Sequence, residues 1–147
     1  ISVKFINEEL YFLQLIRRKM SKPINITNAH RVAYLYLYFA TETDQQLASE
    51  EMMVISDKVE NFLNKNMDIN KNLNSWDIVS ETLNWFNSLS ATDKTINYQK
   101  LIETLKENFN DEQKACFLND LKELAKSDGV FLEAEKVLID KSAELLS

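Results

Sequence analysis

The sequence predicts an all-α fold, a bundle of about seven helices around a buried central helix. Glycine and proline occur once each in 147 residues, whereas sandwiches and barrels need many of both in their tight turns. Nine of the ten side chains in residues 31–40, RVAYLYLYFA, are apolar or aromatic. Elsewhere, apolar residues recur at steps of three and four, the spacing of one helix face. A helix that is apolar all round belongs inside a bundle.

We predict this central helix at residues 27–42, a stretch without Gly or Pro that is longer than a typical strand. Tyrosines and leucines alternate over residues 34–38, which is a strand signature, but Thr27 and Asn28 are suitable helix N-caps. We expect the tyrosines to be core residues with their hydroxyls at the rim. The alternative is that they, or residues 76–89, form an exposed docking surface for a partner.

Six amphipathic helices are predicted around the central one. They span residues 2–20, a segment from Ser49 to about Met67, a segment beginning at Ser75, residues 96–109, a segment from Asn110 to about Asp128, and residues 132–146. The Asn-rich residues 64–74 are expected to form a loop. Asn110 and Gln113 resemble a capping box, and Gly129, the only glycine, suits a helix C-terminus.

Two of these helices have clear apolar stripes. The helix from Ser49 carries Met52, Ile55, Val59, Phe62 and Leu63, and the helix at 96–109 carries Tyr98, Leu101, Ile102, Leu105 and Phe109. Both stripes are expected to face the central helix.

Length and charge limit the possible functions. With 45% apolar and 27% charged residues, we expect one domain covering residues 1–147. No apolar run approaches the roughly 20 residues that span a bilayer, so no membrane insertion is expected. The net charge of −6 opposes nucleic-acid binding, and we expect protein partners instead. We expect a cytoplasmic location, and Ile1 in place of Met indicates a trimmed or processed N-terminus.

Two stretches, one in each half of the chain, share an acidic pattern. Residues 44–51 read DQQLASEE and residues 128–135 read DGVFLEAE. In both, an aspartate at a helix end is followed at +3 by an apolar residue and at +7 by a glutamate in the first turn of the next helix.

The segments FATETDQQLASEEM and LAKSDGVFLEAEKVLI resemble the two signatures of the TerB-like (tellurite resistance) helical domain family. That family is related to the amino-terminal region of a DnaJ-like membrane co-chaperone. Over residues 27–146 the resemblance implies an all-α domain whose acidic motifs lie near each other on one face. It also implies a link to stress and tellurite resistance without an established catalytic activity. The family's acidic positions correspond to Asp44, Glu51, Asp128 and Glu135, with Glu50 and Glu133 as neighbours.

Two functions follow from these observations. The first is a non-catalytic helical binding or scaffold module. The alternative is a divalent-cation-binding protein that holds Ca²⁺ or Mg²⁺ with Asp44, Glu51, Asp128 and Glu135, because these ions prefer carboxylate oxygens. Residues 41–60 contain six acids against a single base, Lys58. Acids in a first helical turn are also favoured by the helix dipole alone.

Catalytic patterns are not found in the sequence, and we do not expect an enzyme. His30 is the only histidine, so no Glu-x-x-His pairs can form a carboxylate-bridged metal site, and one glycine cannot make a phosphate-binding loop. We expect His30 to be an ordinary cap-region side chain. Cys116, in the apolar run ACFL, is expected to be an inert core thiol.

Overall fold

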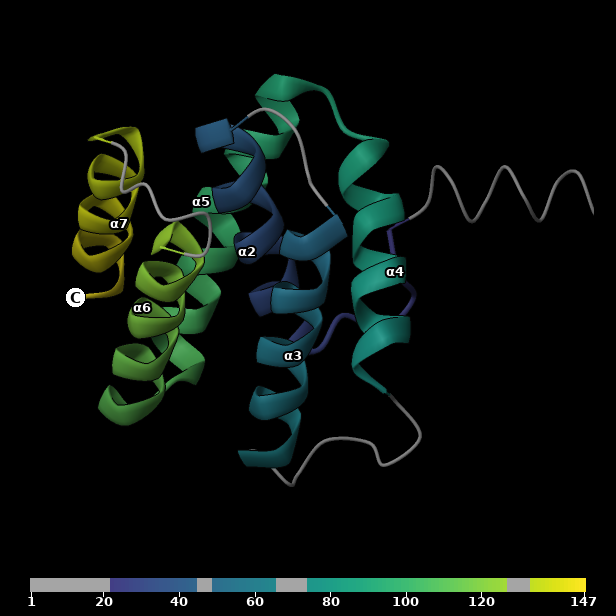
Figure 1. The fold of residues 1–147 in the computed structure, drawn as a ribbon, viewed down its shortest axis with the longest axis horizontal. Coiled ribbons are helices and arrows are strands. Elements are labelled where there is room, and N and C mark those ends of the chain that lie inside the picture. The colour runs from purple at the N-terminus through teal and green to yellow at the C-terminus, as the bar shows by residue number, and fades with distance from the viewer. Residues whose placement is uncertain (1–21, 45–48, 66–73, 127–132) are drawn as a thin grey trace, which may run out of the picture.

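The computed structural model describes residues 22–44, 49–65, 74–126 and 133–147. Within these ranges the chain forms helices and no strand, which confirms the all-α prediction. In chain order the helices are α2 (Asn28–Asp44), α3 (Ser49–Lys65), α4 (Ser75–Asn87), α5 (Ala91–Asn108), α6 (Asp111–Lys126) and α7 (Glu133–Leu146) (Figure 1). The helix predicted at residues 2–20 lies outside the described residues, as does most of the predicted loop at 64–74.

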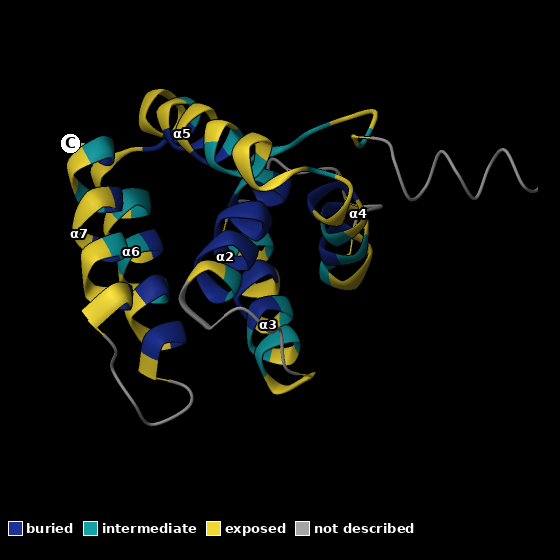
Figure 2. Ribbon diagram, turned by 90° about the horizontal axis from the view of Figure 1, so that it is seen from above, coloured by how far each residue is buried: buried dark blue, intermediate teal, exposed yellow. Residues whose placement is uncertain are grey.

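The helix α2 is the centre of the bundle. It contacts each of the five other described helices, and every residue from Val32 to Ala40 is buried (Figure 2). The apolar residues of all six helices form one cluster around it. The prediction of a buried central helix is therefore confirmed, with an end two residues later than the sequence indicated.

The three tyrosines of α2 are core residues whose hydroxyls reach polar groups on neighbouring helices. Tyr34 donates to the Lys94 carbonyl oxygen at 2.8 Å, and the Tyr38 hydroxyl lies 3.3 Å from Thr95 Oγ1. Tyr36 donates to Asp120 Oδ2 at 2.7 Å. This confirms the core prediction and is incompatible with a docking surface made of these tyrosines.

His30 helps to cap the N-terminus of α2, as expected. The Thr27 N–H donates to His30 Nδ1 at 3.2 Å, and the His30 N–H donates to Thr27 Oγ1 at 3.4 Å. This is the reciprocal pattern of a capping box, with histidine at the position usually held by Glu or Gln. Nδ1 accepts here, so the ring hydrogen belongs on Nε2, which lies 3.0 Å from Glu81 Oε2 on α4.

The helix α5 begins five residues before the predicted start at residue 96, which is a correction. Ser90 has extended backbone angles and its Oγ accepts from the Asp93 N–H at 3.1 Å. Ser90 therefore caps the helix, and Asp93 in the first turn suits the helix dipole. The start at residue 96 was predicted from apolar periodicity, which does not detect this cap. The predicted stripe itself, from Tyr98 to Phe109, is buried.

The helix α6 begins as predicted. The Gln113 N–H donates to Asn110 Oδ1 at 2.8 Å, and the Asn110 N–H donates to Gln113 Oε1 at 2.9 Å. This reciprocal capping box fixes the helix start beside α5. The helix α7 begins at Glu133, and Gly129 lies outside the described residues.

Candidate functional site

The structure places three of the four acidic residues predicted from the sequence. Asp44 is the last residue of α2, Glu51 is half-buried in the first turn of α3, and Glu135 is buried in the first turn of α7. Asp128 lies outside the described residues. The neighbouring Glu50 and Glu133 are exposed.

The helix ends that carry Asp44 and Glu135 lie at one end of the bundle. In Figures 1 and 2 the C-terminal end of α2 and the N-terminal end of α7 are on the same side of the molecule. Among the described residues, however, no group of three or more His, Cys, Asp or Glu side chains is placed to hold a metal ion. Since Asp128 is not among them, the four-residue cation site stays a prediction.

A second cluster of charged residues, which the sequence analysis missed, lies between α3 and α6. Lys58 on α3 is buried, and its Nζ lies 3.5 Å from Asp120 Oδ1 and within hydrogen-bonding distance of Glu123 Oε2. A buried ammonium group is costly unless it is paired. The hydrogen bond from Lys58, together with its positive charge, lowers the pKa of Glu123 below its ordinary value.

Tyr36 connects this charged pair to the central helix. Its hydroxyl donates a hydrogen bond to Asp120 Oδ2. The Asp120 carboxylate therefore accepts this hydrogen bond and also forms an ion pair with Lys58. Burial, followed by the nearby Asp120 charge, raises the pKa of Tyr36 well above its ordinary value. The hydroxyl therefore stays protonated and remains a donor. We call Tyr36, Lys58, Asp120 and Glu123 the Lys58 cluster; it joins α2, α3 and α6.

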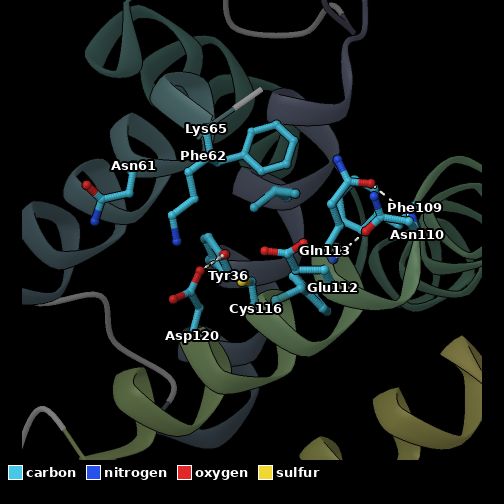
Figure 3. A pocket seen from close by; sticks show the side chains of 12 residues that line it. Tyr36, Asn61, Phe62, Lys65, Phe109, Asn110, Glu112, Gln113, Cys116 and Asp120 are labelled. Carbon is cyan, nitrogen blue, oxygen red and sulfur yellow. Dashed lines mark hydrogen bonds between the residues drawn. The ribbon is translucent and has the colours of Figure 1, made fainter. Parts of the chain in front are cut away.

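A pocket of about 430 Å³ lies beside the Lys58 cluster, between α2, α3 and α6 (Figure 3). Part of its lining is apolar and largely aromatic, and we call this part the aromatic floor; it consists of Val32, Tyr36, Phe62, Phe109 and Phe117. The Phe62 and Phe109 rings are 5.7 Å apart, and Tyr36 stacks on Phe117 at the same centroid distance. These ring contacts hold the floor in a defined shape.

Charged side chains of both signs line the pocket above this floor. Figure 3 shows the Lys65 amine and the Glu112 carboxylate pointing into the pocket from α3 and α6. Glu112, Cys116 and Asp120 follow one another at steps of four residues, so they share one face of α6. The Asp120 carboxylate is already engaged by the Lys58 cluster.

The prediction that Cys116 is a core thiol is wrong. Cys116 is exposed and lines the pocket, whereas the next residue, Phe117, is buried. Successive helical residues are rotated by about 100°, so the core position that Phe117 occupies leaves Cys116 on the pocket face. The apolar run ACFL was too short to show which of its residues faces inward.

Comparison with protein families gives one match. The family described as tellurite resistance protein TerB matches residues 33–147, which is most of the chain. The chain belongs to the TerB family. Comparisons with curated proteins and with solved structures gave no match.

The pocket of this TerB-family domain presents one thiol, carboxylates, amides and an amine. His30, the sole histidine of the sequence, is occupied at the start of α2 by Thr27 and Glu81. A thiol nucleophile is usually activated by an adjacent base or a lowered pKa, and the pocket lining contains no histidine.

In the described part of the TerB-family domain, no helix combines the length and the apolar character needed to cross a bilayer.

Lys58 could have been identified from sequence spacing. It follows Ile55 by three residues and precedes Phe62 by four, which places it on the stripe side of α3. Lys58 is also the single base among the six acids of residues 41–60. A lysine on an apolar face, with aspartate and glutamate available on another helix, indicates a buried pair.

Proposed function

We propose that this TerB-family domain is a non-catalytic binding module for a protein partner, and that the partner docks in the pocket between α2, α3 and α6. The observation that carries the proposal is the pocket itself, an aromatic floor beneath charged groups of both signs. Its volume lies within the range of roughly 300 to 1,000 Å³ typical of ligand sites. The net charge of −6 supports a protein rather than a nucleic acid as the partner.

The walls of the pocket are well supported, which favours a preformed site. The Lys58 cluster ties α2, α3 and α6 together at one side. The capping box of Asn110 and Gln113 fixes the start of α6 at the other. A site held on rigid helices loses less conformational entropy on binding than a mobile loop does.

Selection from a random peptide library on the immobilised domain tests this proposal. Peptides selected on the wild type should lose binding to Cys116→Trp, whose indole would fill the pocket. They should keep binding to Lys122→Trp, a matched change at an exposed position of α6 outside the pocket lining. Circular dichroism would establish that both variants are folded. Selected peptides that bind both variants equally would refute the pocket as the docking site.

The alternative function is divalent-cation binding through Asp44, Glu51, Asp128 and Glu135. It is favoured by the position of the ends of α2 and α7 at one end of the bundle.

Thermal unfolding of the metal-free domain with added Ca²⁺, Mg²⁺, Mn²⁺ or Zn²⁺ tests the alternative. An ion at about a hundred times its dissociation constant would add roughly 2.7 kcal/mol to the free energy of unfolding. This stabilisation should disappear in an Asp128→Asn, Glu135→Gln variant. An unchanged melting temperature with every ion would contradict the cation site. The acids would then be explained by their favourable interaction with the helix dipoles.

We further propose that the module contributes to tellurite resistance, which the family description supports. A tellurite-sensitive bacterial host expressing the chain should tolerate more tellurite than a host expressing Cys116→Trp at the same level. Equal tolerance in the two strains, with equal protein levels, would show that the pocket has no role in tellurite resistance.

A further inference from the structure

We propose that the pocket recognises the carboxyl terminus of a partner protein that ends in a large apolar residue and carries a basic residue shortly before it. This inference rests on the proposed binding function and names the chemistry of the partner. Three parts of the pocket carry it: the aromatic floor, the Lys65 amine and the acidic rim at the start of α6.

The aromatic floor selects the apolar side chain. Phe62, Phe109 and Phe117 reach it from α3, the end of α5 and α6. A volume of about 430 Å³ suits one large side chain with the adjoining main chain rather than a long segment. Burying a large apolar side chain is favourable, so this contact would contribute to the affinity.

The Lys65 amine selects the terminal carboxylate. Among the described residues, the ion pairs involve His30 and Lys58 and none involves Lys65. The positive charge of Lys58 is matched by Asp120 and Glu123, so Lys65 is the cation of the pocket that is available to a ligand. A C-terminal residue carries its carboxylate and its side chain on one Cα, so the two groups can reach Lys65 and the floor together.

The acidic rim selects the basic residue. Asp111 and Glu112 are exposed in the first turn of α6, and Glu112 points into the pocket (Figure 3). A basic side chain upstream of the terminal residue would pair with Glu112. The net charge of −6 would also speed the approach of a basic segment.

Fluorescence anisotropy with defined peptides tests the inference. The probes are labelled hexapeptides that contain arginine two residues before a C-terminal Phe, Leu or Trp, each made as the free acid and as the amide. The free acid should bind the wild type at least tenfold more tightly than its amide, the factor expected for one charge-assisted hydrogen bond. Lys65→Gln should remove this difference, whereas Lys122→Gln, the same change at an exposed site outside the pocket lining, should keep it.

The basic residue is tested in the same assay. Replacing the peptide arginine by glutamine should weaken binding severalfold to the wild type and have little effect with Glu112→Gln. Glu103→Gln, an exposed glutamate of α5 outside the pocket lining, serves as the matched control.

The outcomes separate this inference from the proposed function. Equal binding of acid and amide to the wild type, or no binding of any of the three free acids, would overturn the terminal-carboxylate inference. Pocket-dependent binding of library peptides without a free terminus would leave the proposed function intact in that case. Loss of the acid-to-amide difference in Lys122→Gln as well would show a general charge effect and would also overturn the inference.

Discussion

The pocket side of the bundle and the end that carries the acidic motifs hold their carboxylates in different ways. Beside the pocket, Asp120 accepts from Tyr36 and lies 3.5 Å from the buried Lys58 amine, so three helices are tied through one carboxylate. At the acidic end, Glu50 and Glu133 are exposed in the first turns of α3 and α7, where the helix dipole accounts for them.

This difference shows that a single buried base within an acidic stretch can organise a polar cluster across several helices. Residues 41–60 contain six acids and one base, Lys58, and the connected polar cluster forms around that base. A buried charge must find partners from other helices, whereas an exposed acid at a helix start needs none. Substitutions in the two regions should therefore differ in their effects on stability.

Removing the Lys58 charge should cause the largest loss of stability. Lys58→Met keeps the buried stem but leaves Asp120 without its cation, and we expect the free energy of unfolding to fall by about 2 kcal/mol. This is below the about 3 to 5 kcal/mol of a fully buried pair, because the Glu123 side chain is 57% exposed. Lys65→Met, on the same helix but exposed, should change it by less than about 0.5 kcal/mol. Equal effects in urea denaturation would contradict a special role for Lys58.

Removing the Tyr36 hydroxyl should cause the next largest loss. Tyr36→Phe deletes the 2.7 Å hydrogen bond to Asp120 and should cost about 1.5 kcal/mol. Tyr38→Phe is the matched control, since its hydroxyl makes a 3.3 Å contact with Thr95 and its loss should cost about 0.5 kcal/mol. If denaturant midpoints rank the two variants in the opposite order, the Tyr36 link is not a major connection between α2 and α6.

The pH dependence should distinguish Glu123 from Glu50. The pKa of Glu123 is lowered in the folded state, so the stability it contributes is present above its unfolded pKa and is lost as the pH falls through its folded pKa. Because Glu123 is largely exposed, this contribution should be below about 1 kcal/mol. Unfolding measured from pH 7 to pH 3 should show a smaller acid-induced loss for Glu123→Gln than for Glu50→Gln. The reverse ranking would place the acid-sensitive contact at the end of the bundle that carries the acidic motifs.

Replacing Cys116 should have the smallest effect on stability. Cys116→Ser should change the free energy of unfolding by less than about 0.5 kcal/mol, because the side chain is exposed. The wild-type thiol should also react completely with a thiol reagent in the native protein. Protection that is lifted only by denaturant would mean that Cys116 is buried after all.

Much of the fold could be predicted from single helices. The run from Val32 to Ala40 had to be buried because no side of it is polar, and the Asn110–Gln113 capping box is a local pattern that the structure reproduces. The start of α5 was predicted too late because Ser90 is separated from the first stripe residue by a polar turn. Periodicity alone does not detect such a polar first turn.

The candidate site was much less predictable, because its residues are distant in the sequence. Tyr36, Lys58 and Asp120 meet only when α2, α3 and α6 pack together. The position of Cys116 likewise depended on which neighbour entered the core.

Local sequence patterns account for the all-α class, the central helix and most helix starts, since these follow from periodicity, capping and the scarcity of glycine and proline. Helix packing accounts for the pairing of Lys58 with Asp120 and Glu123 and for the pocket between α2, α3 and α6. The two groups of features differ in the range over which their interactions act. Capping and amphipathicity act over three or four residues, whereas a buried charge and a pocket wall are completed by side chains from helices that only packing brings together.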